Sequence, residues 1–311
     1  MSEFHHVSVL LDECLDGLNI RPEGIYVDGT LGGAGHSSQI AKRLTTGRLI
    51  GIDRDRVALQ AAGERLAPYG DRVTLVHANF CEIRRVLQEL QLPGVDGILL
   101  DLGVSSPQLD DGERGFSYMA DAPLDMRMNR EDALSAYDVV NTWSYEELRR
   151  ILFDYGEERY APRIADAICR RRDEHPIETT LELVDVIRGA MPAAALREKQ
   201  HPAKRSFQAI RIAVNDELGS VETVMRDAIP CLNPGGRLAV ITFHSLEDRI
   251  VKNAMAEAAK GCTCPPHFPV CVCGKKPRVQ LVNRKPITST QEELEINPRA
   301  RSAKLRVCEK I

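Results

Sequence analysis

The sequence predicts an α/β fold, namely a doubly wound, mostly parallel sheet with an all-helical domain inserted into it. Three short apolar runs near the N-terminus each end on an acid, at Asp28, Asp53 and Asp101, and a glycine-rich turn follows the first. From about 108 to 205, by contrast, only helical periodicity is found. Acids and glycines at the carboxyl edge of such a sheet are typical of a site for a nucleoside-type ligand.

The elements of the sheet domain follow from apolar periodicity. Helices and strands alternate in the first hundred residues, which implies parallel strands joined by right-handed crossovers. We expect helices over 10–18, 36–44, 55–67 and 81–91, and strands over 25–27, 49–52, 73–76 and 95–100. The strand pattern resumes at 237–243, after a long helix expected over 206–229 and a turn at 233–236.

The intervening segment predicts a domain of its own. Helical periods occur over 132–141, 145–155, 158–172 and 180–191, punctuated by prolines. Insertions at the carboxyl ends of strands are where an α/β fold adds substrate recognition. We therefore predict a discontinuous catalytic domain over 1–107 and 206–311 and an inserted helical substrate-recognition domain over 108–205.

Composition limits the class of protein. The chain has 311 residues, is 43% hydrophobic and has no apolar run as long as a membrane helix. Its N-terminus lacks a basic-then-apolar signal pattern, so we expect a cytosolic protein with no membrane partner. The net charge is −4, yet residues 260–311 hold eleven Lys or Arg against four Glu, and a second basic cluster lies over 197–211. Such patches suit a structured polyanion, although a solvated, loose tail explains the C-terminal charge equally well.

The glycine-rich turn favours S-adenosylmethionine over a dinucleotide. Asp28 stands before the glycines, the glycines are spread over 29–35, and Ser38 occupies the third position of the dinucleotide fingerprint. S-adenosylmethionine has no diphosphate, and its carboxylate suits the amides of a helix N-terminus. Asp53 is placed to bind the ribose, and Phe80 either supports the adenine or belongs to the core.

The segment after the fourth strand predicts amine chemistry. Asp101 is followed by a turn that contains Ser105, Ser106 and Pro107. The exocyclic amine of a base is a poor nucleophile, so catalysis depends on fixed acceptors that turn its lone pair toward the methyl group. Gln108 replaces the aromatic that stacks on the base in cytosine-N4 enzymes, so the stacking residue is sought at Phe116, Tyr118 or Phe243. A plain surface turn is the alternative.

Four cysteines lie close together near the C-terminus, at Cys262, Cys264, Cys271 and Cys273. Four thiols in a cytosolic protein could bind zinc tetrahedrally. The Cys-x-Cys spacing is nevertheless a poorer match to a zinc knuckle than Cys-x-x-Cys, so a loop with unpaired thiols is slightly favoured over a zinc site. Zinc is not expected to be essential to the reaction.

Motifs along nearly the whole chain resemble the ribosomal RNA small subunit methyltransferase H family. The matching segments are 6–13, 28–30, 35–37, 52–55, 100–111, 113–117, 123–128, 155–159, 201–205, 207–211, 243–249 and 297–302. The resemblance implies a class I, Rossmann-like methyltransferase that uses S-adenosylmethionine to methylate N4 of one cytidine in the decoding centre of 16S rRNA, with an assembled or nearly assembled small subunit as its partner. It also implies cofactor contacts at Ala34, Gly35, His36, Asp53, Phe80, Asp101 and Gln108.

Roles follow for the remaining candidates. Asp101 would bind the cofactor's ammonium or the target amine, and the serine–proline turn would orient the base. Phosphate contacts are expected from basic side chains at Lys204, Arg205, Arg211, Arg249, Arg299 and Arg301. Two rivals stay open: a DNA amino-methyltransferase, and a ribosome-assembly factor that binds RNA and S-adenosylmethionine without turnover.

Overall fold

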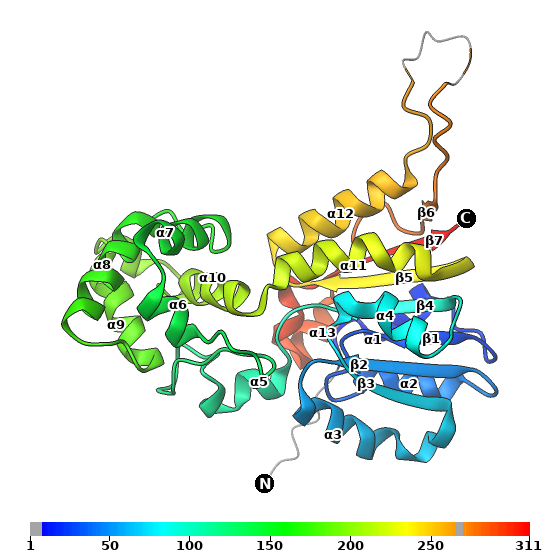
Figure 1. Ribbon diagram of the computed structural model, residues 1–311, viewed down its shortest axis with the longest axis horizontal. Coiled ribbons are helices and arrows are strands. Elements are labelled where there is room, and N and C mark those ends of the chain that lie inside the picture. The colour runs from blue at the N-terminus through cyan, green and yellow to red at the C-terminus, as the bar shows by residue number, and fades with distance from the viewer. Residues whose placement is uncertain (1–7, 265–269, 271) are drawn as a thin grey trace. The chain divides into compact units, whose positions relative to one another are not determined.

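The computed structural model describes residues 8–264, 270 and 272–311, with the side chain of Ser106 left out. The chain divides into two compact units (Figure 1). The sheet unit comprises Met1–Gly103 and Leu218–Ile311, and the helical unit comprises Val104–Glu217. Each unit is described by itself below.

A seven-stranded sheet forms the centre of the sheet unit, in the order β3-β2-β1-β4-β5-β7-β6. Strands β1 to β5 pair in parallel, whereas β7 is antiparallel to both of its neighbours. The bounds are β1 (Ile25–Asp28), β2 (Arg48–Asp53), β3 (Val73–His77), β4 (Val95–Asp101), β5 (Leu232–Thr242), β6 (Val279–Leu281) and β7 (Lys304–Lys310).

Helices bury both faces of this sheet, because successive strand residues point to opposite sides. In β4, Ile98 and Leu100 belong to one apolar cluster, whereas Leu99 belongs to another. The first cluster includes side chains of α4 (Ile83–Glu89), α11 (Glu217–Cys231) and α12 (Ser245–Ala259), and the second includes side chains of α1 (Leu11–Leu18), α2 (Gly35–Arg43) and α3 (Arg56–Leu66). Short helix α13 (Gln291–Ile296) precedes β7.

The helical unit has an apolar core of its own, to which Leu148, Ile164, Leu183 and Ile210 contribute. Its helices are α5 (Ser106–Asp110), α6 (Ala136–Thr142), α7 (Tyr145–Asp154), α8 (Ala161–Glu174), α9 (Thr180–Ala190) and α10 (Lys204–Asn215). Capping boxes fix the starts of four of them, at Ser105, Ser135, Ser144 and Thr179. The cap at Ser135 explains why α6 begins four residues later than periodicity suggests.

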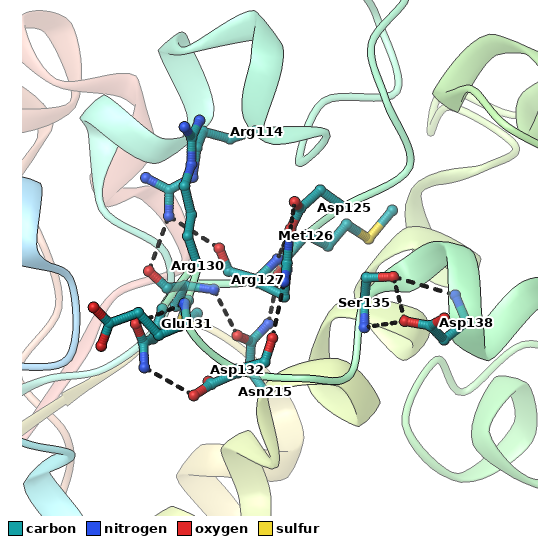
Figure 2. A network of polar contacts seen from close by, with 12 residues as sticks. Arg114, Asp125, Met126, Arg127, Arg130, Glu131, Asp132, Ser135, Asp138 and Asn215 are labelled. Atoms are coloured by element: carbon teal, nitrogen blue, oxygen red, sulfur yellow. Dashed lines mark hydrogen bonds and ion pairs between the residues drawn. The ribbon is translucent and has the colours of Figure 1, made fainter.

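A polar network orders the irregular segment before α6 (Figure 2). The guanidinium of Arg114, which is only 4% exposed, donates to the carbonyl oxygens of Arg127 and Met128 at 2.9 Å. The side chain of Asn215 donates to the Met126 carbonyl and accepts from the Met128 amide, both at 2.8 Å. These bonds supply the backbone partners that a helix or sheet would otherwise provide.

Three expectations about the fold need correction. The units divide at 103/104 and 217/218 rather than at 107/108 and 205/206, because Phe207 and Ile210 of α10 pack in the helical core. The long helix expected over 206–229 is two helices, α10 and α11, separated at Asp216, where φ is +45°. Apolar periodicity does not predict strands β6 and β7. In the described part of the chain, no helix has the length and apolar character needed to cross a membrane.

Candidate active site

Three acids meet at the carboxyl edge of the sheet because β2, β1 and β4 are neighbours and end on Asp53, Asp28 and Asp101. Asp28 is only 2% exposed, and its carboxylate is hydrogen-bonded to neighbouring groups of the sheet unit. Its carboxylate accepts from the Ser37 hydroxyl at 2.7 Å and from the Thr30 amide at 3.1 Å, while burial raises its pKa. Asp28 therefore ties the glycine turn to α2.

Asp53 holds the same turn from the neighbouring strand. Its Oδ2 accepts from the Gly32 amide at 2.7 Å and its Oδ1 from the Asp55 amide at 2.8 Å. Burial raises the pKa of this carboxyl to about 6. The side chain is still partly exposed, and each carboxylate oxygen has a further acceptor position. Asp53 can thus hold the turn and accept hydroxyl hydrogens at once.

The turn itself is shaped for close approach to the start of α2. Ala34, the residue before α2, has φ of +58°, and no side chain caps the helix among the described residues. A Cβ on Gly35 would lie 1.9 Å from the Ser8 hydroxyl oxygen, so only glycine fits there. A helix start that lacks a side-chain cap offers amides to a carboxylate.

The side chain of His36 is buried against the same edge. Its Nε2 lies 3.0 Å from the Val9 carbonyl oxygen, and its Nδ1 lies 3.8 Å from Oδ2 of Asp101. A carbonyl oxygen only accepts, so Nε2 carries the hydrogen and Nδ1 faces the carboxyl group. Both ring nitrogens of His36 thus face groups of the protein itself, and a cofactor contact of this residue stays a prediction.

Asp101 is the unusual group of the site. Its amide donates to the Thr30 hydroxyl at 2.6 Å, but its buried Oδ1 has no hydrogen-bond partner among the described residues. Burial, with smaller contributions from Asp28 and Glu247, raises the pKa of Asp101 to about 8. A carboxylate oxygen without a partner among the described residues, in a group close to other acids, favours a cationic ligand. The ammonium and sulfonium of S-adenosylmethionine fit this requirement.

Phe80 lies three residues after the end of β3, at the start of a short 3-10 helix (Phe80–Glu82), and is partly buried. It packs against the apolar cluster that also contains Leu100, and its Cβ is 3.1 Å from the point where a Cβ on Gly29 would lie. Phe80 therefore belongs partly to the core, and its contact with the adenine stays a prediction.

The serine–proline turn belongs to the helical unit and begins α5. Ser105 Oγ accepts from the Gln108 amide at 3.4 Å, and Gln108 Oε1 accepts from the Ser105 amide at 3.1 Å, which forms a capping box. Ser105 and the buried Gln108 thus have a structural task in addition to any ligand contact. Pro107 is exposed, and the side chain of Ser106 lies outside the described residues.

The three candidate stacking aromatics differ in environment. Phe116 is buried, with the Arg114 guanidinium carbon 5.8 Å from its ring centre. Tyr118 stacks on His201 at 4.6 Å between ring centres and 16° between planes. Phe243, directly after β5, is partly exposed. Phe116 is therefore the poorest candidate for stacking on a base.

Arg211, one of the six basic candidates, forms an ion pair with an acid of the helical unit. Its guanidinium donates to both carboxylate oxygens of Glu217, at 2.8 and 2.9 Å, so its charge is compensated within the helical unit. Arg205 is partly exposed and bonds the Glu157 carbonyl at 3.5 Å. The other four are exposed: Lys204, Arg249, Arg299 and Arg301.

The predicted cysteine cluster is partly described. Cys262, Cys264 and Cys273 lie together, with sulfur atoms within 4.8 Å of one another, while Cys271 lies outside the described residues.

Sequence reasoning missed three groups of the site: Thr30, Ser37 and Glu247. Thr30 and Ser37 hold the backbone of Asp101 and the carboxylate of Asp28, and Glu247 raises the pKa of Asp101. A signal was available, because Thr30 lies within the glycine-rich turn, Ser37 follows it, and Glu247 lies in the first turn of the helix after β5.

The sheet order, the antiparallel β7 and the acidic carboxyl edge define a class I methyltransferase. The chain also matches the model of the MraW methylase family over residues 3–311 and belongs to that family, whose methyl donor is S-adenosylmethionine.

Similar proteins cover the same length. Ribosomal RNA small subunit methyltransferase H of Brevibacillus brevis is 62% identical over 309 residues, covering 99% of this chain and 98% of that protein. The proteins of the same name from Heliobacterium modesticaldum and Clostridium botulinum are 60% and 59% identical over 310 residues each, covering 99% of this chain and 99% and 100% of those proteins.

Proposed function

We propose that this chain transfers a methyl group from S-adenosylmethionine to N4 of one cytidine in the decoding centre of 16S rRNA, within an assembled or nearly assembled small subunit in the cytoplasm. The observation that carries the proposal is the identity of about 60% with small subunit rRNA methyltransferases over their full length. The acidic edge described above is consistent with it.

The cofactor residues have separate tasks in this proposal. Asp53 accepts the ribose hydroxyls, Phe80 supports the adenine, and the amides at Ala34, Gly35 and His36 receive the carboxylate. Gln108 adds a further cofactor contact. When bound, S-adenosylmethionine supplies an electrophilic methyl group on a positively charged sulfur.

Asp101 acts at the meeting point of cofactor and base. Its Oδ1 has no partner among the described residues, and it accepts a hydrogen bond from the cofactor's ammonium or from the exocyclic amine of cytosine. Ser105, Ser106 and Pro107 supply fixed oxygens and a stiff turn that align the amine. This is catalysis by positioning, and it needs no strong base before methyl transfer.

Recognition of RNA is assigned to the helical unit and to exposed basic residues of the sheet unit. Lys204 and Arg205 lie at the start of α10, and Arg249, Arg299 and Arg301 are exposed on the sheet unit. Arg211 is left out of the contact set because Glu217 already neutralises it.

Transfer of a labelled methyl group tests the function and both rivals. Small subunits lacking the modification, naked 16S rRNA and duplex DNA are compared as acceptors. The proposal expects strong labelling of the small subunit and little of DNA. Labelling of DNA alone would identify a DNA amino-methyltransferase, and binding of RNA and cofactor with no transfer to any acceptor would identify an assembly factor.

A further inference from the structure

A long connection joins α12 to β6 (Figure 1). We call it the hairpin, and three of its cysteines lie close together. The sulfur atoms of Cys262, Cys264 and Cys273 lie within 4.8 Å of one another, and those of Cys262 and Cys273 are 3.7 Å apart. A disulfide would bring two sulfurs to about 2.05 Å, so the 3.7 Å between the sulfurs of Cys262 and Cys273 is too long for a bond between them. The side chains therefore gather at one point without a covalent bond between them.

The backbone of the hairpin is folded around these sulfurs. Each accepts one amide hydrogen at a donor–sulfur distance of 3.4 Å: Cys262 from the amide of Cys264, Cys264 from Val272, and Cys273 from Thr263. Backbone amides that point at cysteine sulfurs surround the ligands of a metal-binding knuckle in the same way. The Cys-x-Cys spacing thus provides the amide contacts expected of Cys-x-x-Cys knuckles.

Apolar packing does not account for this convergence. Val270 and Val272, the large apolar residues next to the cluster in the described part of the hairpin, are 70% and 75% exposed. Farther from the cysteines, the two arms are joined by a 2.8 Å bond from the Arg278 amide to the Ala258 carbonyl and by an ion pair between Lys275 and Glu257. The cysteine end of the hairpin therefore needs another source of folding free energy.

We propose that Cys262, Cys264 and Cys273 bind a structural zinc ion that cross-links the two arms of the hairpin. Thiolates are soft ligands that select zinc over magnesium or calcium, and a zinc site can supply the folding free energy that a small loop lacks. Exposed Lys260, Lys276 and Arg278 on the arms offset the negative charge of the thiolates. The ion has no part in methyl transfer, so the proposal does not depend on the substrate.

Metal analysis of the purified full-length chain tests the site. We expect about one zinc ion per chain, as for other structural zinc sites, and an intense thiolate-to-metal absorption band after replacement by cobalt. Cys264→Ser and Cys273→Ser should lose both signals. Cys169→Ser is the matched control, because Cys169 is a partly buried cysteine of α8, and it should keep both.

Calorimetry with S-adenosylhomocysteine provides the folding control, since all variants should keep wild-type affinity for that ligand. Four results would overturn the proposal. These are a wild-type chain without zinc that also gives no thiolate band with cobalt, zinc retained by Cys273→Ser, iron in place of zinc, and an intact mass lower by two hydrogens, which would reveal a disulfide.

Discussion

Replacement of Asp101 by asparagine removes the carboxylate with the unpartnered oxygen while keeping nearly the same shape. The pKa of Asp101 lies near 8, so below that pH the carboxyl must lose its proton before it can pair with a cation. Each pH unit below the pKa costs about 1.4 kcal/mol, which is tenfold in affinity. The wild-type dissociation constant for S-adenosylmethionine should therefore fall by up to about tenfold per unit between about pH 6 and pH 8 and level off above.

The asparagine variant should lack this dependence. Its affinity is expected to resemble that of the protonated wild type at low pH and to stay there, so the ratio of the two dissociation constants grows with pH. Calorimetry of both proteins in the same buffers measures this ratio. Titration of the cofactor's own amine affects both dissociation constants equally, so it does not change the ratio. Parallel pH profiles for the two proteins would refute the assignment of a cation to Asp101.

The pH dependence of folding stability tests the raised pKa of Asp101 without the cofactor. The folded state holds the Asp101 proton more tightly than the unfolded state, so protonated Asp101 contributes to the free energy of unfolding. That contribution is fully present below about pH 4 and is lost as the pH rises to about 8. Asp101→Asn removes this loss. The variant should therefore unfold at a higher denaturant concentration than the wild type at pH 8, and an unchanged difference between pH 5 and pH 8 would count against the raised pKa.

Three further substitutions test other parts of the account. Asp53→Ala removes the ribose acceptor and the partner of the Gly32 amide, and calorimetry should show cofactor affinity at least roughly tenfold weaker; unchanged affinity in a folded variant would remove Asp53 from the site. Joint replacement of Lys204 and Arg205 by glutamine should reduce the salt slope of rRNA binding by roughly 1 to 2 and leave cofactor affinity unchanged, whereas an unaltered slope would exclude phosphate contacts. Asn215→Ala leaves the buried Met128 amide and Met126 carbonyl unpaired and should lower the stability of the helical unit by about 2–4 kcal/mol in chemical denaturation, and a wild-type midpoint would contradict the network of Figure 2.

The sheet domain was largely predictable because buried parallel strands read as short apolar runs. Asp28, Asp53 and Asp101 could be placed at one edge from their positions after such runs. Their different environments could not be read in the same way. Asp28 accepts a hydrogen bond from Ser37 of the next helix, while Oδ1 of Asp101 has no partner among the described residues. That difference depends on tertiary contacts, which strand periodicity does not reveal.

The C-terminal strands and the Arg211 contact were harder to predict. Strand β7 carries charged residues, yet its buried Leu305 and Val307 alternate with them, which was a usable signal. Its Arg306 donates to Asp248 of α12 at 2.7 Å, a partner nearly sixty residues away. Arg211 pairs with Glu217 because the chain turns at Asp216. Apolar periodicity predicts one continuous helix there and so gives no sign of the turn.

The central claim is tested most directly by mapping the product. Small subunits from cells that lack this protein are incubated with it and S-adenosylmethionine, and the rRNA is then digested and analysed by mass spectrometry. We expect one added methyl group, on N4 of a single cytidine in the decoding centre, and none with the Asp101→Asn variant. Methylation at another atom or another nucleotide, or undiminished transfer by Asp101→Asn, would contradict the account.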